Sequence, residues 1–207
     1  MHRLLWALVA LSACAKPPAE LDDLGPLPPF VLVDEAGHTV SDQSLRGTVW
    51  AANFLFTSCP TACPPLAKAT AELQAKIAPW ASDGAPVRLV SVSVDPMTDT
   101  PDVLTAFGRK YGAEPRLWSF LTGNYETMER LVVRGFLQPL LRSDRPVGGA
   151  EDATALTQPT PLDTAHSLRF VLVDQRGHVR AYYDKDDAGQ HKLAAALRWL
   201  RDHPAQE

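Results

Sequence analysis

The sequence predicts one α/β domain in which helices flank a single mixed sheet, and three observations lead to this fold class. Between residues 28 and 203, stretches with strand periodicity alternate with stretches of helical periodicity. The chain has 207 residues, enough for one domain with a substantial core but too few for two large ones. Its composition, 45% hydrophobic and 21% charged, excludes collagen-like and low-complexity chains.

The N-terminal half of the domain begins with a predicted β-hairpin. Residues 30–33 and 38–41 flank the turn sequence DEAG, and the similar sequence FVLVDQRGHVR at 170–180 predicts a second hairpin with the same turn chemistry. The nearly continuous apolar run 49–56 predicts a buried central strand. Leucine, alanine and isoleucine then recur at helical spacing, which predicts an amphipathic helix that ends before Pro79.

The C-terminal half continues the alternation. Residues 87–94 are β-branched and alternating, which predicts a strand. Thr100 and Pro101 are typical of a helix start, and Asn124 is expected to cap a third helix that reaches about Val133. Residues expected on the apolar face of the helix after Pro101 are Val103, Leu104, Phe107 and Tyr111. After the long Pro/Gly-rich segment 138–165, the predicted elements are strands 168–173 and 179–183 and a closing helix marked by Leu193, Leu197 and Leu200.

The charge of the chain limits the classes of partner. The formal net charge is −4 at pH 7, and no block of lysine or arginine occurs. Neutralising the phosphates of DNA or RNA requires clustered positive charge. We therefore expect no nucleic-acid partner.

The N-terminus carries a predicted export signal. A short positive start precedes eight apolar residues, Leu4–Leu11, a run far shorter than the roughly 20 residues that a membrane-spanning helix needs. The following Leu-Ser-Ala-Cys sequence resembles a bacterial lipobox, which implies removal of residues 1–13 and lipidation of Cys14. Residues 14–27 then form a proline-rich tether before the domain at 28–203. We expect the protein on the periplasmic side of the cell envelope, held by its lipid at a membrane, the cytoplasmic membrane being the expected one.

Two cysteines carry the predicted chemistry. Cys59 and Cys63 follow the buried strand and precede a helix, where the positive end of the helix dipole favours a thiolate. Spacing of four residues suits two thiolates that converge on one soft metal ion. A structural disulfide is the alternative, although so short a loop would contribute little chain entropy.

A metal site of this kind needs a third ligand, and the chain has six histidines. His38 and His178 follow turn glycines and are expected to face solvent, while His191 and His203 flank the last helix. His166 differs, because it lies at the end of the long segment and just before a predicted buried strand. The pattern alone leaves open whether it is a ligand or a capping or core histidine.

Several sequence blocks together resemble the Sco/SenC family. The match covers roughly residues 28–200 with its blocks in the family's order, and they are TSCPTACP at 57–64, VSVSVDP at 90–96 with DTP at 99–101, LTG at 121–123, and His166-Ser167 before a strand ending in Asp174. The resemblance implies a thioredoxin-like fold. It also implies a copper site, for Cu(I) or Cu(II), made by Cys59, Cys63 and His166, and a function in maturing the dinuclear copper centre of cytochrome c oxidase. The copper-accepting subunit of that oxidase would then be the partner.

Two further features of the sequence bear on this resemblance. Asp95, at a strand end, is a candidate for tuning the site, although an Asp-Pro there also simply shapes a turn. The segment 138–165 is longer than the family's usual connection, a departure from the family's pattern that bears on the docking surface for the partner. Zinc is chemically permitted by two cysteines and a histidine, and copper is preferred because of the resemblance.

Two other activities are alternatives to copper delivery. The cysteine pair also suits a thiol–disulfide oxidoreductase that reduces the cysteines of the oxidase subunit or of another envelope protein, and the two activities are compatible. A peroxidase of the peroxiredoxin type is disfavoured, because its characteristic proline and threonine would fall on Ala52 and Phe56.

Overall fold

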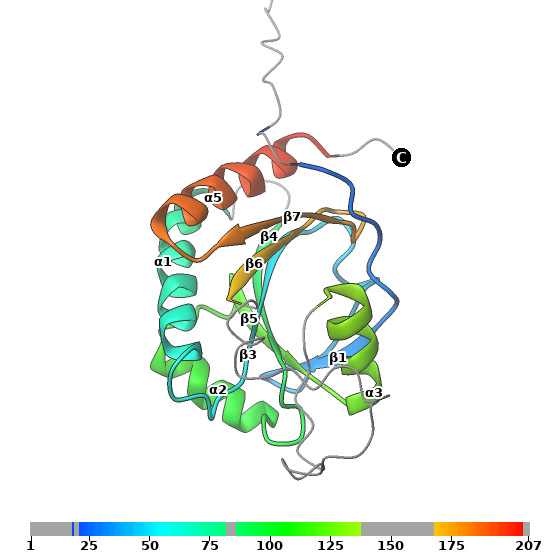
Figure 1. Ribbon diagram of the computed structural model, residues 1–207, viewed down its shortest axis with the longest axis vertical. Coiled ribbons are helices and arrows are strands. Elements are labelled where there is room, and N and C mark those ends of the chain that lie inside the picture. The colour runs from blue at the N-terminus through cyan, green and yellow to red at the C-terminus, as the bar shows by residue number, and fades with distance from the viewer. Residues whose placement is uncertain (1–17, 19–20, 82–85, 138–167, 205–207) are drawn as a thin grey trace, which may run out of the picture.

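The computed structural model describes residues 18, 21–81, 86–137 and 168–204 and shows one mixed seven-stranded sheet. The sheet order is β2-β1-β5-β4-β3-β6-β7, which confirms the predicted mixed sheet (Figure 1). Its strands are β1 (Val31–Asp34), β2 (Thr39–Ser41), β3 (Val49–Leu55), β4 (Val87–Ser93), β5 (Trp118–Thr122), β6 (Arg169–Val173) and β7 (Val179–Asp184). The central strands β3, β4 and β5 run parallel, so the loops that follow them emerge at one edge of the sheet.

Helices cover both faces of the sheet. They are α1 (Cys63–Ala81), α2 (Pro101–Lys110), α3 (Tyr125–Met128) with the π-helix η1 (Glu129–Gly135), and α5 (Asp187–Asp202). Alternate residues of β3 point to opposite faces, so that Ala51 packs with α1, α2 and α5, whereas Trp50 and Ala52 pack with α3 and η1. Figure 1 shows α1, α2 and α5 on one side of the sheet and α3 on the other.

A buried polar network ties α1 to the centre of the sheet. The Asn53 side-chain amide donates to Thr70 Oγ1 of α1 at 2.8 Å, and Ser91 Oγ donates to Asn53 Oδ1 at 2.8 Å. Trp118 Nε1 in turn donates to Ser91 Oγ at 2.8 Å. All four side chains are fully buried, and their hydrogen bonds to one another satisfy polar groups that would otherwise be costly in the core.

The two hairpins share the turn chemistry that their sequences predicted. In the first, Asp34 Oδ1 accepts the backbone N–H groups of Ala36 and His38, and in the second Asp174 Oδ1 accepts those of Arg176 and His178. Gly37 and Gly177 occupy the matching positions with φ of 81° and 74°, values that glycine adopts without steric cost.

The segment Leu21–Leu27 lies along the start of the edge strand β7. Backbone hydrogen bonds of 2.9 Å join Leu24 N to Val179 O, Val179 N to Gly25 O, and Leu27 N to Gly177 O. Arg180 fastens the same segment, because its Nε donates to the carbonyl of Asp22 at 2.7 Å while its Nη1 pairs with the fully buried Asp174 at 3.0 Å. This segment therefore covers part of an edge strand that would otherwise expose unpaired backbone groups.

Two local expectations were wrong. Helix α1 continues through Pro79 to Ala81, because an exposed proline near a helix end removes a single hydrogen bond that water replaces. Val103 is 38% exposed, and the buried face of α2 is formed by Leu104 and Phe107 instead. The third helix, capped by Asn124 as predicted, changes into η1 and extends to Gly135. Among the described residues, no helix is long and apolar enough to cross a membrane.

Candidate metal and redox site

The two predicted cysteines lie where β3 gives way to α1. Every residue of β3 is buried, and the chain leaves the sheet after Leu55 and turns at Cys59, whose N–H donates to Phe56 O at 3.3 Å. Cys63 is the first residue of α1, and Pro64 and Pro65 follow it in the first turn, where a missing N–H costs no helical hydrogen bond. Both thiols are thereby held at the N-terminus of a long helix that has no acidic residue in its first turn.

The two thiols are reduced and close to one another. Both cysteines are free and buried, with Cys59 8% exposed and Cys63 3% exposed. The backbone N–H of Cys63 donates to Cys59 Sγ at 3.3 Å, and the N–H of Phe56 donates to Cys63 Sγ at 3.5 Å. Each sulfur therefore accepts a backbone N–H, a contact that favours a thiolate.

The surroundings of Cys59 favour its ionised form. Burial alone would raise its pKa, but hydrogen bonds from the backbone N–H groups of Cys63, Thr61 and Ala62 and from the Cys63 thiol outweigh burial. The pKa of Cys59 therefore lies below the ordinary thiol value of 9.0. Such lowering at a helix N-terminus is typical of nucleophilic or metal-binding cysteines.

The pKa of Cys63 is shifted in the opposite direction. Burial is the largest effect on it, and the neighbouring Cys59 and Asp99 add to it, so that the pKa of Cys63 rises to about 12 despite the N–H contact from Phe56. At any given pH, the thiolate form is therefore more populated at Cys59 than at Cys63 in the metal-free reduced pair.

Asp99 joins the cysteine loop to the neighbouring strand, and the sequence alone gave no reason to assign it a role. Its carboxylate accepts the Thr57 N–H at 3.2 Å, the Thr57 hydroxyl at 2.6 Å and the Ser93 hydroxyl at 2.7 Å. Thr57 precedes Cys59 by two residues, and Ser93 ends β4, which pairs with β3. The only sequence signal was the position of Asp99 within the DTP block, two residues before the proline that starts α2.

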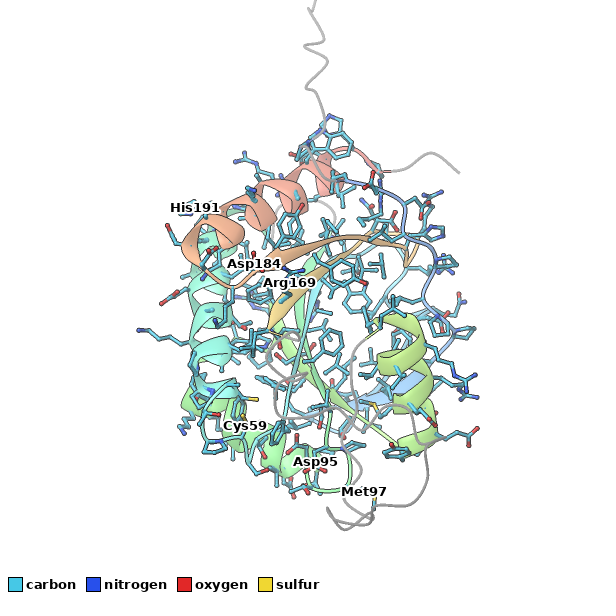
Figure 2. The ribbon with its side chains drawn as sticks, in the orientation of Figure 1. Cys59, Asp95, Met97, Arg169, Asp184 and His191 are labelled. Carbon is cyan, nitrogen blue, oxygen red and sulfur yellow. The ribbon has the colours of Figure 1, made fainter. Side chains whose placement is uncertain are left out.

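Asp95 lies in the same loop and is nearly buried, at 9% exposure. Its backbone carbonyl accepts the N–H groups of Thr98 and Asp99, and its own N–H donates to Ser93 Oγ at 3.1 Å, so it shapes the turn between β4 and α2. Its Oδ1 has no hydrogen-bond partner among the described residues. Figure 2 shows Asp95 and Cys59 at the same end of the molecule, while the expectation that Asp95 tunes the site stays a prediction.

The predicted third ligand and the predicted lipidation site lie outside the described residues. His166 and Cys14 fall there, so their predicted roles stay predictions. The described histidines have other partners: His38 contacts Asp34 at 3.2 Å, His178 contacts Asp23 at 2.9 Å, and the Nδ1 atoms of His191 and His203 contact backbone carbonyls within α5. In the described part of the chain, no three His, Cys, Asp or Glu side chains are grouped to hold a metal ion.

Comparison with known proteins establishes the family. The model of the SCO1/SenC family matches residues 21–202, nearly the whole described domain. The chain belongs to the SCO1/SenC family. It is 38% identical to the SCO1 protein homolog of Bacillus subtilis over 109 residues, which are 52% of this chain and 55% of the relative, so it spans about half the length of that relative.

Solved structures confirm the thioredoxin-like fold of this SCO1/SenC chain. It aligns with a SCO1/SenC family lipoprotein from Bacillus anthracis at 27% identity and a TM-score of 0.65, over 88% of this chain and 96% of that one. BsSco, a member of the Sco family of cytochrome c oxidase assembly proteins in which a disulfide switch was identified, aligns at 26% identity and a TM-score of 0.66, over 88% and 98% of the two chains. Copper-bound ScoI from Bradyrhizobium japonicum shares the fold, at 21% identity, a TM-score of 0.58 and coverages of 85% and 99%.

Proposed function

We propose that this SCO1/SenC protein binds copper through Cys59, Cys63 and His166 and delivers it to the dinuclear copper centre of a cytochrome c oxidase. The observation that carries the proposal is the reduced pair of adjacent thiols at the N-terminus of α1, each accepting a backbone N–H. Thiolate sulfur is a soft ligand that selects Cu(I), and an added imidazole allows the site to bind Cu(II) as well. Magnesium, calcium and manganese prefer oxygen ligands and bind such a site poorly.

The same cysteine pair explains how copper is released as well as how it is bound. Copper binding requires the second thiol to give up its proton, because the thiolate is the ligand. A partner that offers its own thiolates can then exchange ligands with the site one at a time. The copper-bound ScoI of the same fold and the oxidase-assembly description of the Sco family support copper as cargo and an oxidase as its destination.

The variant His166→Ala tests the ligand set. We expect it to abolish stoichiometric Cu(II) binding, seen as loss of the sulfur-to-copper charge-transfer band, while Cys59 and Cys63 still oxidise to a disulfide. His191→Ala is the matched control, because His191 is an exposed histidine on α5 and should leave the band unchanged. Copper binding by His166→Ala as tight as by the parent would show that the ligand assignment is wrong.

A thiol–disulfide oxidoreductase is the second candidate function, and the unequal pKa values of the two cysteines favour it. Cys59, whose pKa is lowered, suits attack on a substrate disulfide, and the more buried Cys63 suits resolution of the mixed disulfide. Catalytic turnover of a disulfide substrate by purified protein that takes up no copper would favour this function over copper delivery.

The proposed anchor has its own test. Cys14 would carry the lipid that holds the domain at the periplasmic side of the membrane, and the description of a family member as a lipoprotein supports this. Cys14→Ser should move the protein from the membrane fraction to the soluble periplasmic fraction and abolish incorporation of labelled palmitate. Retention of Cys14→Ser in the membrane fraction would exclude this cysteine as the anchor.

A further inference from the structure

The segment Leu21–Leu27 is attached to the domain at several points before the first strand begins. Three backbone hydrogen bonds of 2.9 Å join it to residues 177–179. Side chains add to this pairing, because His178 Nδ1 contacts Asp23 Oδ1 at 2.9 Å and Arg180 Nε donates to a carbonyl of the segment at 2.7 Å. The segment therefore pairs with the free edge of β7 as a further strand would.

The segment also crosses the edge of the sheet and packs against both apolar cores. Leu21 contacts the core shared by α1, α2 and α5, whereas Leu27 contacts the core on the side of α3 and η1. Gly135, at the end of η1, lies so close that a Cβ added to it would be 3.2 Å from Leu27 Cδ2 and 2.7 Å from Pro28 Cδ. Apolar contacts on both sides of the sheet therefore oppose release of the segment.

The docked segment and the cysteine pair lie at opposite edges of the sheet. β7 is antiparallel to β6, and β6 is antiparallel to β3, so β7 starts at the edge where β3 starts. Val179 pairs with Val173, and Val173 pairs with Trp50, near the beginning of β3. The loop that holds Cys59 follows Leu55, the last residue of β3. In Figure 1 the blue segment begins at the upper end of the domain, and Figure 2, in the same orientation, shows Cys59 near the lower end.

Docking shortens the connection between the domain and the proposed lipid. The seven residue steps from Cys14 to Leu21 span at most about 25 Å. If the segment were released, the sixteen steps from Cys14 to the buried Phe30 would span at most about 55 Å. A domain of about 180 residues is about 40 Å across. The cysteine end can touch the membrane only if the opposite end stands roughly one domain diameter above it, which the longer connection allows and the shorter one does not.

We propose that Leu21–Leu27 is an orienting strap, which by docking on β7 keeps the cysteine pair on the side of the domain that faces away from the membrane. The proposal rests on the proposed lipid anchor at Cys14, and it defines the class of partner. A protein that exchanges copper or electrons with the pair must present its own ligands on a soluble domain that stands well above the lipid surface. A partner whose ligands lie at the lipid surface is out of reach while the orienting strap is docked.

The first measurement tests docking alone and needs no membrane. Leu24→Pro removes the N–H that donates to Val179 O, and Leu24 is 53% exposed, so the change removes little packing. Leu24→Ala keeps the N–H and is the matched control. We expect hydrogen exchange at the Val179 amide, which donates to Gly25 O, to become at least about fivefold faster in Leu24→Pro and to stay unchanged in Leu24→Ala, as followed by NMR. Unchanged exchange in Leu24→Pro would overturn the proposal.

The second measurement compares the two ends of the domain by energy transfer to the membrane. The lipidated protein is placed in vesicles of phosphatidylethanolamine and phosphatidylglycerol that contain a rhodamine-labelled acceptor lipid. A donor dye is attached through Thr61→Cys or through His203→Cys, both exposed positions, in a background in which the two site cysteines are serine. His203 follows α5 close to the docked segment, because the Leu200 carbonyl accepts the side-chain amide of Gln175 in the β6–β7 turn at 2.6 Å.

With the orienting strap intact, we expect stronger energy transfer from position 203 than from position 61. This difference should be lost when Leu24→Pro is combined with Asp23→Ala, because the domain can then turn over on the longer connection. Equal transfer from both positions in the intact protein, or a difference that persists in the double variant with fast Val179 exchange, would overturn the proposal. If the double variant does not fold, the intact protein still decides.

The outcomes also separate this proposal from those on which it rests. Protein that does not bind the vesicles would refute the lipid anchor and the orientation together, while slow exchange at Val179 would still show that the segment is docked. Copper binding by Leu24→Pro should equal that of the parent, because Leu24 lies at the edge of the sheet opposite the cysteine pair. Failure of the copper proposal would therefore appear in the parent protein and leave the orientation measurement unaffected.

Discussion

The unequal ionisation of the two cysteines predicts that a small alkylating reagent distinguishes them sharply. The pKa of Cys63 is raised to about 12, while that of Cys59 lies below 9.0. A separation of at least about 3 units makes the thiolate of Cys59 about a thousandfold more abundant than that of Cys63 at pH 7. The intrinsic nucleophilicity of a thiolate falls as its pKa falls, with a slope near 0.4–0.5, which removes a factor of about 15–30. The net preference for Cys59 is therefore about 30-fold to 60-fold.

The assay is a timed reaction of the reduced protein with iodoacetamide at pH 7, followed by quenching, digestion and mass spectrometry of the peptide that holds both cysteines. The Cys14→Ser background leaves only the two thiols of the site to react. The matched control is the same reaction in concentrated urea, where the two thiols should react within about twofold of each other because their surroundings are lost. The rate at Cys59 should rise with pH and level off at a lower pH than the rate of an ordinary thiol of pKa 9.0, whereas Cys63 should respond only in strongly alkaline solution. Equal rates at the two cysteines in the folded protein would refute the reasoning.

Three further predictions concern stability, each read from urea unfolding monitored by circular dichroism. Asn53→Ala should lower the free energy of unfolding by about 2–4 kcal/mol, because it removes one hydrogen bond from each of the buried hydroxyls of Thr70 and Ser91 and leaves the Ser91 proton without its acceptor, and a loss below about 1 kcal/mol would contradict this. Arg180→Met should cost about 3–5 kcal/mol by leaving the buried Asp174 charge without its closest cation, and a neutral result would show that Arg176 compensates fully. Gly189→Ala should destabilise by at least about 1 kcal/mol although alanine favours helices, because the new Cβ would collide with the backbone carbonyl of Asp184.

Local sequence patterns predicted most of the architecture because the responsible forces act over a few residues. The apolar run that became β3, the Asn124 cap and the two Asp-to-Gly turns each depend on neighbouring residues alone. The cysteine pair was predicted for the same reason, since a spacing of four residues at a helix start brings two side chains together. The prediction was wrong where the effect of one residue depended on its position in the folded protein. Pro79 was expected to end its helix, but it lies within α1.

The sequence by itself determined the fold class, the family and the two thiols, because short local motifs and their order along the chain indicate each of them. Only the tertiary structure decided the chemical difference between those thiols. Cys59 and Cys63 are the same residue type four positions apart, yet backbone N–H groups lower one pKa while burial and the Asp99 charge raise the other. Asp99 lies 36 residues beyond Cys63 in the sequence, and no local pattern shows that parallel pairing of β3 with β4 brings it there. Burial and through-space charge depend on which distant segments meet, and that is settled when the sheet assembles.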